Sequence, residues 1–223
     1  MTLAARVPLG RAPRLRDETA AAEGAIVARM RTSPKAEAAP TDAELLCGYA
    51  AGDQSAARTL TLRHAPRVFA LARRMLGDAA EAEDVTQEAM LRLWRIAPDW
   101  EEGRAALGTW LYRVASNLCI DRLRRRRESG SDAVPEIADE APGVVRALEA
   151  RDRAAALETA LAALPERQRL AIVLRHFEDR GNPEIATILG VSVEAVESLL
   201  ARARRELAAR LAPRRAELGF TDG

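Results

Sequence analysis

The side chains of this chain best suited to recognition chemistry are arginines and an asparagine on one stretch of predicted helix. Arg113, Asn117 and Arg124 in the segment TWLYRVASNLCIDRLRRRR are spaced so that a helix brings them close together on one face. An exposed guanidinium binds phosphate, and an amide can both donate to and accept from a base edge. The face therefore predicts contact with nucleic acid, although the run Arg124–Arg127 would also suit a helix C-terminus.

A second candidate face lies upstream and is acidic. Residues Asp78 to Glu88 include five acids and no base, and helical spacing places four polar residues on one exposed face: Glu81, Asp84, Gln87 and Glu88. A different face of the same predicted helix is apolar and consists of Val85, Ala89 and Leu93, with Met90 and Trp94 beside them. Acids are also favoured near a helix N-terminus by about 0.3–1 kcal/mol each, so the pattern alone allows a purely structural role.

Residue spacing gives no sign of catalysis or of metal binding. Cys47 and Cys119 are far apart, and His64 and His176 are isolated from any Cys-x-x-Cys pattern, so we expect core or surface roles for all four. The sequence contains no Ser/His/Asp set, phosphate-binding loop or carboxylate–histidine cluster. We therefore expect no enzymatic activity and no cofactor.

The composition indicates an all-α protein with separated charges. The 223 residues include 4% aromatics, alanine recurs at helical spacing, and 34 basic residues nearly balance 33 acidic ones. Six arginines lie between Arg113 and Arg127 and six more between Leu199 and Arg215, each run with a single acid. Two basic stripes are an electrostatic footprint for phosphate, although two solvated helix faces remain the alternative.

Targeting signals are not evident in the sequence. The N-terminal arginines precede no apolar segment of the signal-peptide type, and no stretch approaches the roughly 18 apolar residues of a membrane span. These observations predict a cytoplasmic, reduced protein with no direct membrane insertion.

Composition shifts divide the chain into two helical domains with flanking segments. Residues 1–40 are proline-interrupted and predicted to be mostly disordered, with a short helix near Thr19–Met30. Residues 128–143 are acidic, broken by two prolines, and predict a flexible linker with few contacts fixing the pose of the two domains. The predicted domains are 41–127 and 144–212, followed by a tail at 213–223.

Helix-capping residues predict four helices in the first domain. Thr41 and Glu44 form a capping-box pattern, and Asp53 can cap a long helix that ends before Gly77. Pro66 is expected to kink or split that helix. An acidic helix then follows Asp78 and extends to about residue 96. Thr109 is expected to cap the last helix, from Trp110 to about Arg127, in which Leu111, Val114/Ala115, Leu118 and Leu123 form the buried stripe.

The second domain has the spacing of a helix-turn-helix. A helix over residues 166–177 is followed by Asn182 and Pro183, a pair suited to the N-cap and first turn of the next helix. Ala186 precedes Gly190 by four residues, and Ser192 is placed to cap the following helix. The basic second half of that last helix predicts DNA binding.

Taken together, these motifs resemble the small extracytoplasmic-function group of bacterial sigma factors, the promoter-recognising subunits of RNA polymerase. The helix over 110–124 is similar to the family pattern W-L-x-x-I-A-x-N-x-x-x-D-x-L-R, with Leu107 and Ser116 where Phe and Arg are frequent. The stretch DAAEAEDVTQE is similar to the family's polymerase-binding segment, and LPERQR at residues 164–169 is similar to the opening of its minus-thirty-five domain. The resemblance covers about residues 42–211.

The resemblance implies three binding surfaces and the fold of sigma regions 2 and 4. Core polymerase binding would involve Asp84, Gln87, Glu88 and Arg95. Minus-ten recognition would involve Trp100, Arg113, Asn117 and Arg124, with Trp100 as a stacking candidate in the base-capturing loop over residues 97–108. Minus-thirty-five recognition would involve Ser192, Glu194, Glu197, Ser198, Arg202 and Arg205. Glu and Leu occupy usually basic places on this recognition helix, so binding shifts toward Arg202 and Arg205, and Glu197 could accept from a cytosine amino group.

The resemblance also implies partners. These are core RNA polymerase, promoter DNA and an anti-sigma factor that holds the protein inactive, although residues 1–40 are a rival inhibitor. A stand-alone helix-turn-helix regulator remains the alternative function, since it accounts for the second domain but leaves the acidic helix and the WLYRVASN stretch without a role. A helical nucleic-acid enzyme is a further alternative, for which the sequence offers no catalytic residues.

Overall fold

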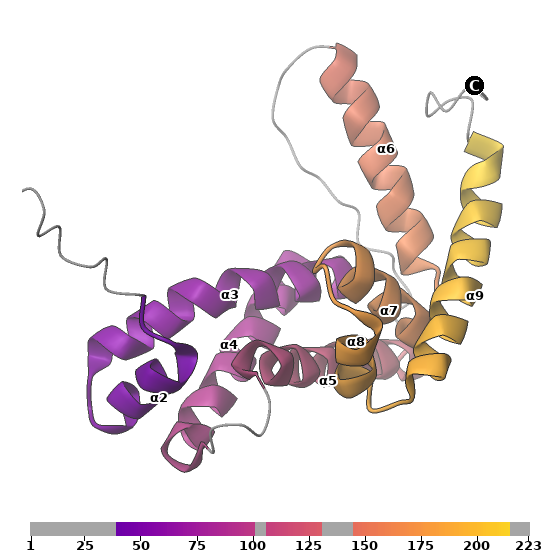
Figure 1. Cartoon of the computed structure of the whole chain (residues 1–223). Helices are drawn as coiled ribbons and strands as arrows, with labels where there is room; N and C mark the ends of the chain where they lie inside the picture. Colours follow the sequence, from indigo (N-terminus) through magenta and orange to yellow (C-terminus); the bar gives the residue numbers. More distant parts are fainter. Residues whose placement is uncertain (1–38, 101–105, 131–144, 215–223) are drawn as a thin grey trace, which may run out of the picture. The chain divides into compact units, whose positions relative to one another are not determined.

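The computed structural model describes residues 39–100, 106–130 and 145–214, with only the backbone of residues 145–151. All regular structure in these residues is helical, which confirms the all-α prediction (Figure 1). The α-helices are α2 (Asp42–Ala50), α3 (Gln54–Leu76), α4 (Ala79–Ile96), α5 (Leu107–Glu128), α6 (Val145–Ala162), α7 (Glu166–His176), α8 (Asn182–Leu189) and α9 (Val193–Leu211), with short 3-10 helices η1 (Ala97–Asp99) and η2 (Ala212–Arg214). The helix suggested near Thr19–Met30 and the linker segment 131–144 lie outside the described residues.

Side-chain caps define the first helices as predicted. The Thr41 hydroxyl accepts from the Glu44 amide at 3.2 Å, and the Glu44 carboxylate accepts from the Thr41 amide at 2.7 Å, which confirms the capping box of α2. Asp53 caps α3, whose C-terminal Gly77 takes the left-handed conformation at φ 74°. Each cap satisfies backbone groups that a helix end leaves without an intrahelical partner.

Pro66 was expected to kink or split this helix; it lies inside the continuous α3, so the helix is not split. Proline removes the hydrogen bond that residue 66 would donate to the Leu62 carbonyl. Leu62 is 68% exposed and Pro66 is also exposed, so water can solvate that carbonyl. The helix continues because residues on the opposite side, including Leu60 and Val68, are buried in the core.

Helix α5 begins three residues earlier than predicted. Thr109 lies within the helix, and the N-cap is Ala106, which provides no side-chain hydrogen bond. The extra turn buries Leu107, which is 3% exposed. Burial of a leucine side chain contributes about 1.5–3 kcal/mol, more than a typical cap of about 1 kcal/mol, so packing determines where this helix begins.

Helices α2 to α5 enclose the first part of the apolar core. Leu60, Leu71 and Met75 on α3 are fully buried, as are Val85 and Leu93 on α4. The predicted apolar face of α4 is confirmed, since Val85, Ala89 and Leu93 have no exposed surface and Met90 is 6% exposed. The predicted stripe of α5 is buried at Leu111 and Ala115 and half-buried at Val114, Leu118 and Leu123, while the sequence analysis missed the buried Tyr112 and Cys119 of that helix.

Helices α7, α8 and α9 form the predicted helix-turn-helix region. Gly190 ends α8 with φ 64°, a left-handed conformation that glycine adopts without strain, and Ser192 caps α9 by accepting from the Ala195 amide at 3.2 Å. The N-cap of α8 is Gly181, one residue before the predicted Asn182. The shift occurs because the Glu184 carboxylate accepts from the Gly181 amide, at 3.2 Å, and so fixes the start of the helix.

The first half of the described fold consists of α2 to α5 and the second half of α6 to α9, and the two halves are in contact. α3 and α5 of the first half pack against α7 and α8 of the second half. The expectation that few contacts would fix the pose of the two domains is therefore not met. Among the described residues, no helix is long and apolar enough to cross a membrane.

Helix α2 is joined to α3 by a polar contact around Asp42. The Arg63 guanidinium donates to one Asp42 oxygen at 2.6 Å, and Nε2 of the buried His64 lies 2.9 Å from the other. Burial lowers the pKa of His64 below its ordinary value, and the nearby Asp42 carboxylate offsets this only in part. The neutral imidazole is therefore favoured in the folded state.

This lowered pKa predicts an acid-sensitive contribution to stability. Stabilisation from neutral His64 should be present above the unfolded-state pKa of about 6.5 and be lost as pH falls through the lower folded-state pKa. Chemical denaturation of wild type and His64→Gln between pH 7.5 and 5 checks this. The difference in unfolding free energy between the two proteins should shrink as pH falls, and a difference independent of pH would contradict the assignment.

Candidate nucleic-acid interface

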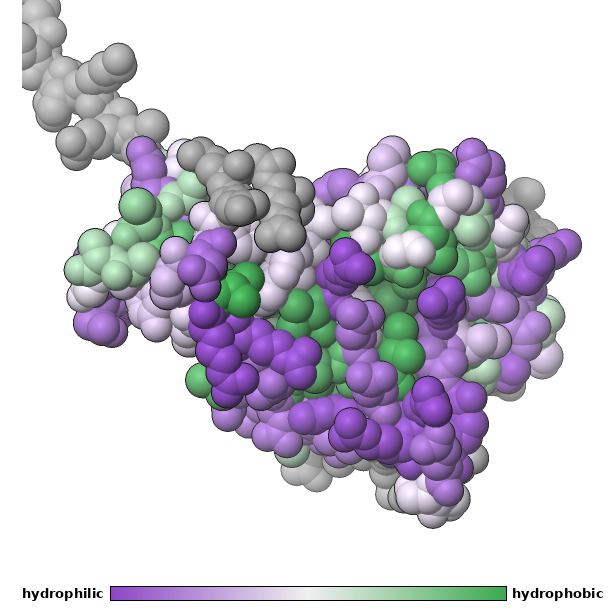
Figure 2. All heavy atoms as spheres, turned by 90° about the horizontal axis from the view of Figure 1, so that it is seen from below, coloured by the Kyte–Doolittle hydropathy of each residue, from purple (hydrophilic) through white to green (hydrophobic). Residues whose placement is uncertain are grey.

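Helix α5 presents the predicted nucleic-acid face. Arg113, Asn117 and Arg124 are all exposed on this helix, as expected from their spacing. The Arg124 guanidinium donates to the Glu128 carboxylate at 2.9 Å, a contact between exposed groups that phosphate could displace at little cost. Hydrophilic residues dominate the surface of the molecule seen in Figure 2, with smaller apolar patches between them.

Two other arginines of α5 face inward, which corrects the expectation that the basic run points outward. Arg126 contacts Glu81 of α4 at 2.6 Å and donates to the Leu76 carbonyl at 3.1 Å. Arg122 donates to the Glu81 carbonyl at 2.8 Å and lies 3.8 Å from the Asp84 carboxylate. These side chains anchor α5 to α4 and to the end of α3, and leave Arg113 and Arg124 facing solvent.

Glu81 is consequently not part of the exposed acidic face to which the sequence pattern assigned it. Its side chain is 33% exposed and forms an ion pair with Arg126. Two remaining members face solvent, since Asp84 has 67% of its side chain exposed and Gln87 is exposed. Glu88 is half-buried and paired with Arg92 at 2.8 Å. Arg95, one turn further, is exposed as well.

The acidic face also contains an apolar residue that was not predicted from the sequence. Leu91 is 49% exposed and follows Gln87 by four residues, so the two side chains are neighbours on α4. An exposed leucine among charged groups suits a protein partner better than DNA, because its side chain contributes binding free energy only when it is buried against an apolar surface. The sequence could have predicted this exposure, because Leu91 lies outside the apolar helical period that includes Val85 and Leu93.

Trp100, the proposed stacking residue, is half-buried. Its ring meets the ring of Trp110 edge-on, with centroids 6.0 Å apart and planes at 88°. Residues 101–105 of the base-capturing loop lie outside the described residues. Trp94 packs on Tyr49 with centroids 4.7 Å apart, which favours a core role for it.

Helix α9 presents its candidate base-contacting residues to solvent. These are Ser192, Glu194, Glu197, Ser198, Arg202 and Arg205, and all six are exposed. The Ser192 hydroxyl is engaged as the N-cap, so its capacity for DNA contact is reduced. Val196, Leu200 and Ala203 on another side of α9 are buried and hold the helix on its neighbours.

The structure places His176 near the basic part of α9, a proximity that the sequence did not reveal. Burial lowers the pKa of His176, at the end of α7, and the positive charges of Arg204 and Arg175 lower it further. The three side chains therefore lie near one another although they come from two helices. No local pattern predicts this cluster, because His176 and Arg204 are 28 positions apart.

Comparison with known proteins accounts for both halves of the chain. The model of Sigma-70 region 2 matches residues 60–129, and that of Sigma-70, region 4 matches residues 154–207. The ECF RNA polymerase sigma factor SigM of Mycobacterium tuberculosis is 36% identical over 168 residues, which cover 75% of this chain and 83% of SigM. SigE of Mycolicibacterium smegmatis is 36% identical over 165 residues, covering 71% of this chain but only 63% of SigE.

Solved structures agree with these matches. The structure of CnrH in complex with the cytosolic domain of CnrY has a TM-score of 0.59 and 30% identity, covering 77% of this chain and 97% of CnrH. Sigma factor RpoE, crystallised with the anti-sigma factor NepR from Bartonella quintana, has a TM-score of 0.53 at 24% identity and covers 70% of this chain and 96% of RpoE, which supports the fold.

The helical fold and the matches to regions 2 and 4 define a transcription initiation factor of the sigma-70 type. The chain belongs to the extracytoplasmic-function group of the sigma-70 family. The region 2 match accounts for the acidic helix and the WLYRVASN stretch, so the stand-alone regulator is not favoured.

The contact between Glu81 and Arg126 should stabilise the region 2 half. Glu81→Ala leaves the half-buried Arg126 without its carboxylate, and we expect the free energy of unfolding to fall by about 1–3 kcal/mol. Glu83→Ala on the same helix is the matched control, because Glu83 is exposed, and it should cost less than about 0.5 kcal/mol. Urea denaturation of both variants provides the measurement, and equal losses would contradict the structural role of Glu81.

Proposed function

We propose that this chain initiates transcription by binding core RNA polymerase through α4 and recognising the two promoter elements through α5 and α9. The observation that carries the proposal is that α4 and α5 expose side chains of opposite charge. Within one compact helical bundle, α4 exposes acids and an amide, whereas α5 exposes arginines and an asparagine. Opposite charges on separate faces suit a protein partner on one side and DNA on the other.

The polymerase-binding face consists of Asp84, Gln87, Glu88 and Arg95, with Leu91 among them. Its charged residues would steer association and set specificity, while Leu91 would supply apolar contact area. The Glu88–Arg92 pair is exposed enough to exchange partners without a large loss of free energy.

The minus-ten face consists of Trp100, Arg113, Asn117 and Arg124. Exposed arginines on α5 would hold the phosphates of the melted strand, and the Asn117 amide would contact a base edge. The Trp100 ring is already supported by Trp110, so it would offer a rigid surface for stacking.

The minus-thirty-five face consists of Ser192, Glu194, Glu197, Ser198, Arg202 and Arg205. The last two would bind phosphate along the major groove, and Glu197 could accept from a cytosine amino group. Arg204, on the same helix, would add positive charge near this face, whereas the lowered pKa of His176 keeps that side chain neutral.

The remaining assignments follow from membership in a family of regulatory subunits. The chain would perform no chemistry itself and would need no cofactor, because the polymerase forms the phosphodiester bonds. It would act in the cytoplasm, where its polymerase is found. An anti-sigma factor is the proposed inhibitor, supported by the structural similarity to RpoE bound to NepR. The domain limits 41–127, 128–143 and 144–212 remain part of this proposal.

Charge reversal on α4 tests the polymerase-binding face. Asp84→Arg with Glu88→Arg should abolish assembly with core polymerase, because the exposed Asp84 and the half-exposed Glu88 both belong to the proposed interface. Helicity and melting temperature should change little, since surface substitutions cost about 0.5 kcal/mol or less. Co-elution with purified core polymerase is the measurement.

The matched control for this reversal is Asp152→Arg with Glu158→Arg, which changes the net charge equally at two exposed positions of α6. This control should still assemble with core polymerase. Normal assembly by the α4 variant would contradict the assignment of the face.

Asn117→Ala tests base recognition in the melted minus-ten element. The holoenzyme should still assemble and bind duplex promoter DNA, but open-complex formation should fall roughly tenfold, the effect of losing a base contact of about 1–3 kcal/mol. Permanganate reactivity of promoter thymines measures the melted fraction. An unchanged melted fraction on a native promoter would exclude the role of Asn117.

Arg202→Ala tests phosphate contact by α9. Loss of one phosphate contact should weaken duplex binding uniformly across promoter sequences and reduce the slope of log affinity against log salt concentration by about one. Arg210→Ala is the matched control, because Arg210 pairs with Glu206 at the far end of the same helix. The role of Arg202 is contradicted if the two variants show the same salt dependence.

A further inference from the structure

A buried polar contact joins the region 2 half to the region 4 half. The Tyr112 hydroxyl of α5 donates to the Glu178 carboxylate, in the segment between α7 and α8, over 2.6 Å. Tyr112 is 2% exposed and the Glu178 side chain 7% exposed. A short hydrogen bond to a buried carboxylate is among the stronger polar contacts in proteins.

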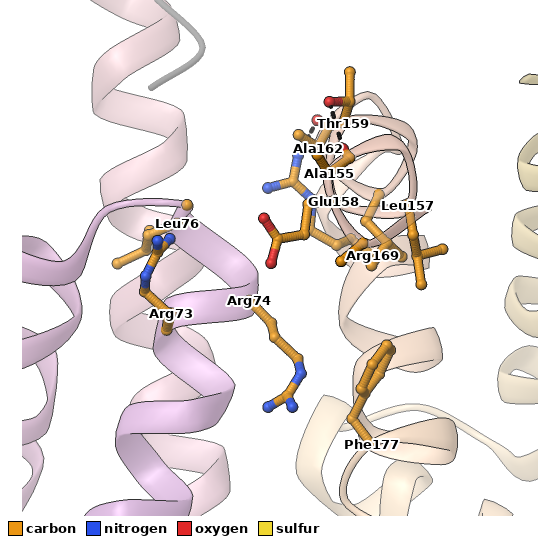
Figure 3. Close-up of a pocket in the computed structure, with 13 residues that line it drawn as sticks. Arg73, Arg74, Leu76, Ala155, Leu157, Glu158, Thr159, Ala162, Arg169 and Phe177 are labelled. Carbon is orange, nitrogen blue, oxygen red and sulfur yellow. Dashed lines mark hydrogen bonds between the residues drawn. The ribbon is translucent and has the colours of Figure 1, made fainter. Parts of the chain in front are cut away.

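Arginines from both halves flank this contact. Arg74 of α3 lies 3.7 Å from Glu178 and 4.6 Å above the ring of Phe177, and Arg180 lies 4.8 Å above the ring of Tyr112. Figure 3 shows Arg74 extending toward Phe177 along one side of a cavity of about 620 Å³ between α3, α6 and α7. The Glu178 charge is thus compensated by Arg74 of the region 2 half, together with the hydrogen bond from Tyr112.

Arg169 makes a second connection between the halves. It is 7% exposed and donates to the Met75 carbonyl, at the end of α3, over 2.5 Å. It also donates to the Ala162 carbonyl, at the end of α6. Arg169 therefore ties α7 to the end of α3 at a point distinct from Tyr112.

The packed arrangement cannot place the two DNA-binding faces on their promoter elements. Elements centred near minus ten and minus thirty-five are about 25 base pairs apart, or about 85 Å along a duplex with a rise of 3.4 Å per base pair. Helix α8 packs directly on α5 and on α9. At 1.5 Å per residue α5 and α9 are only about 33 and 29 Å long, and Asn117 lies midway along α5. The faces are exposed in this arrangement but too close together.

We propose that the Tyr112–Glu178 contact is a latch that keeps the free chain closed and must open before both promoter elements can be bound. The inference rests on the proposed assignment of the two DNA-binding faces. Opening would expose the Tyr112 ring and return the Glu178 carboxylate to water. Because solvation of that carboxylate compensates for the lost partners, the closed state would be favoured only modestly and could be displaced by polymerase and DNA.

Energy transfer between two dyes on the free, full-length chain tests the latch. One dye is attached at the exposed Cys47 of α2 and the other at Ala209→Cys, an exposed position of α9. Cys119 will not compete, since it is fully buried and burial raises its pKa to about 12. Single-molecule measurement then gives the fractions of closed and open chains without polymerase or DNA.

Tyr112→Phe removes only the hydroxyl and should raise the ratio of open to closed chains roughly tenfold, which corresponds to about 1.4 kcal/mol. Glu178→Ala should shift the ratio in the same direction. Tyr49→Phe is the matched control, because Tyr49 packs on Trp94 within the region 2 half, and it should leave the ratio unchanged. Circular dichroism establishes that each variant remains folded.

Three outcomes would overturn the latch: a wild-type chain that is already mostly open, a Tyr112→Phe variant with the wild-type ratio, or an equal shift with Tyr49→Phe. Transcription with purified core polymerase separates this inference from the proposed function. Tyr112→Phe should start transcription at a lower protein concentration than wild type. If no version of the chain supports transcription while the dye experiment succeeds, the proposed function fails and the closed state stands.

Discussion

The bridge from α5 to α4 is the contact on which the arrangement of the region 2 half depends. Arg122 and Arg126 bind the main chain and the side chain of Glu81, and Arg126 also holds the end of α3. With the rotation of α5 fixed in this way, Arg113 and Asn117 face solvent while Leu111 and Ala115 enter the core. The same contact therefore determines which arginines stabilise the fold and which remain available to DNA.

Local signals in the sequence were sufficient for most of the fold. Thr41, Asp53, Gly77 and Ser192 define helix ends through hydrogen bonds or backbone conformations that involve only near neighbours, and their positions were predicted correctly. The apolar period of α4 likewise identified its buried face. The start of α5 was missed because burial of Leu107, a tertiary effect, outweighed the local preference of Thr109 for a cap.

The candidate interfaces were predictable as faces but not residue by residue. Arg113 and Arg126 are the same residue type on the same helix, and only contacts with Glu81, 45 positions before Arg126, distinguish their roles. Tyr112 and Glu178 are 66 positions apart and carry no pattern that would pair them. Helical periodicity reports which side of a helix is apolar, whereas it contains no information on which distant element covers that side.

Arg169 carries a consequence for how the sequence can change over evolution. Its guanidinium binds the main-chain carbonyls of Met75 and Ala162, so it recognises the path of the backbone at two helix ends rather than the side chains there. The residue types at positions 75 and 162 can therefore change without the loss of these hydrogen bonds, since the acceptors are main-chain carbonyls. Position 169 has no such freedom, since lysine lacks the planar fork that reaches two acceptors at once. This contact therefore restricts the residue type at position 169 alone. A contact between two side chains would instead have linked two positions, which would then change together during evolution.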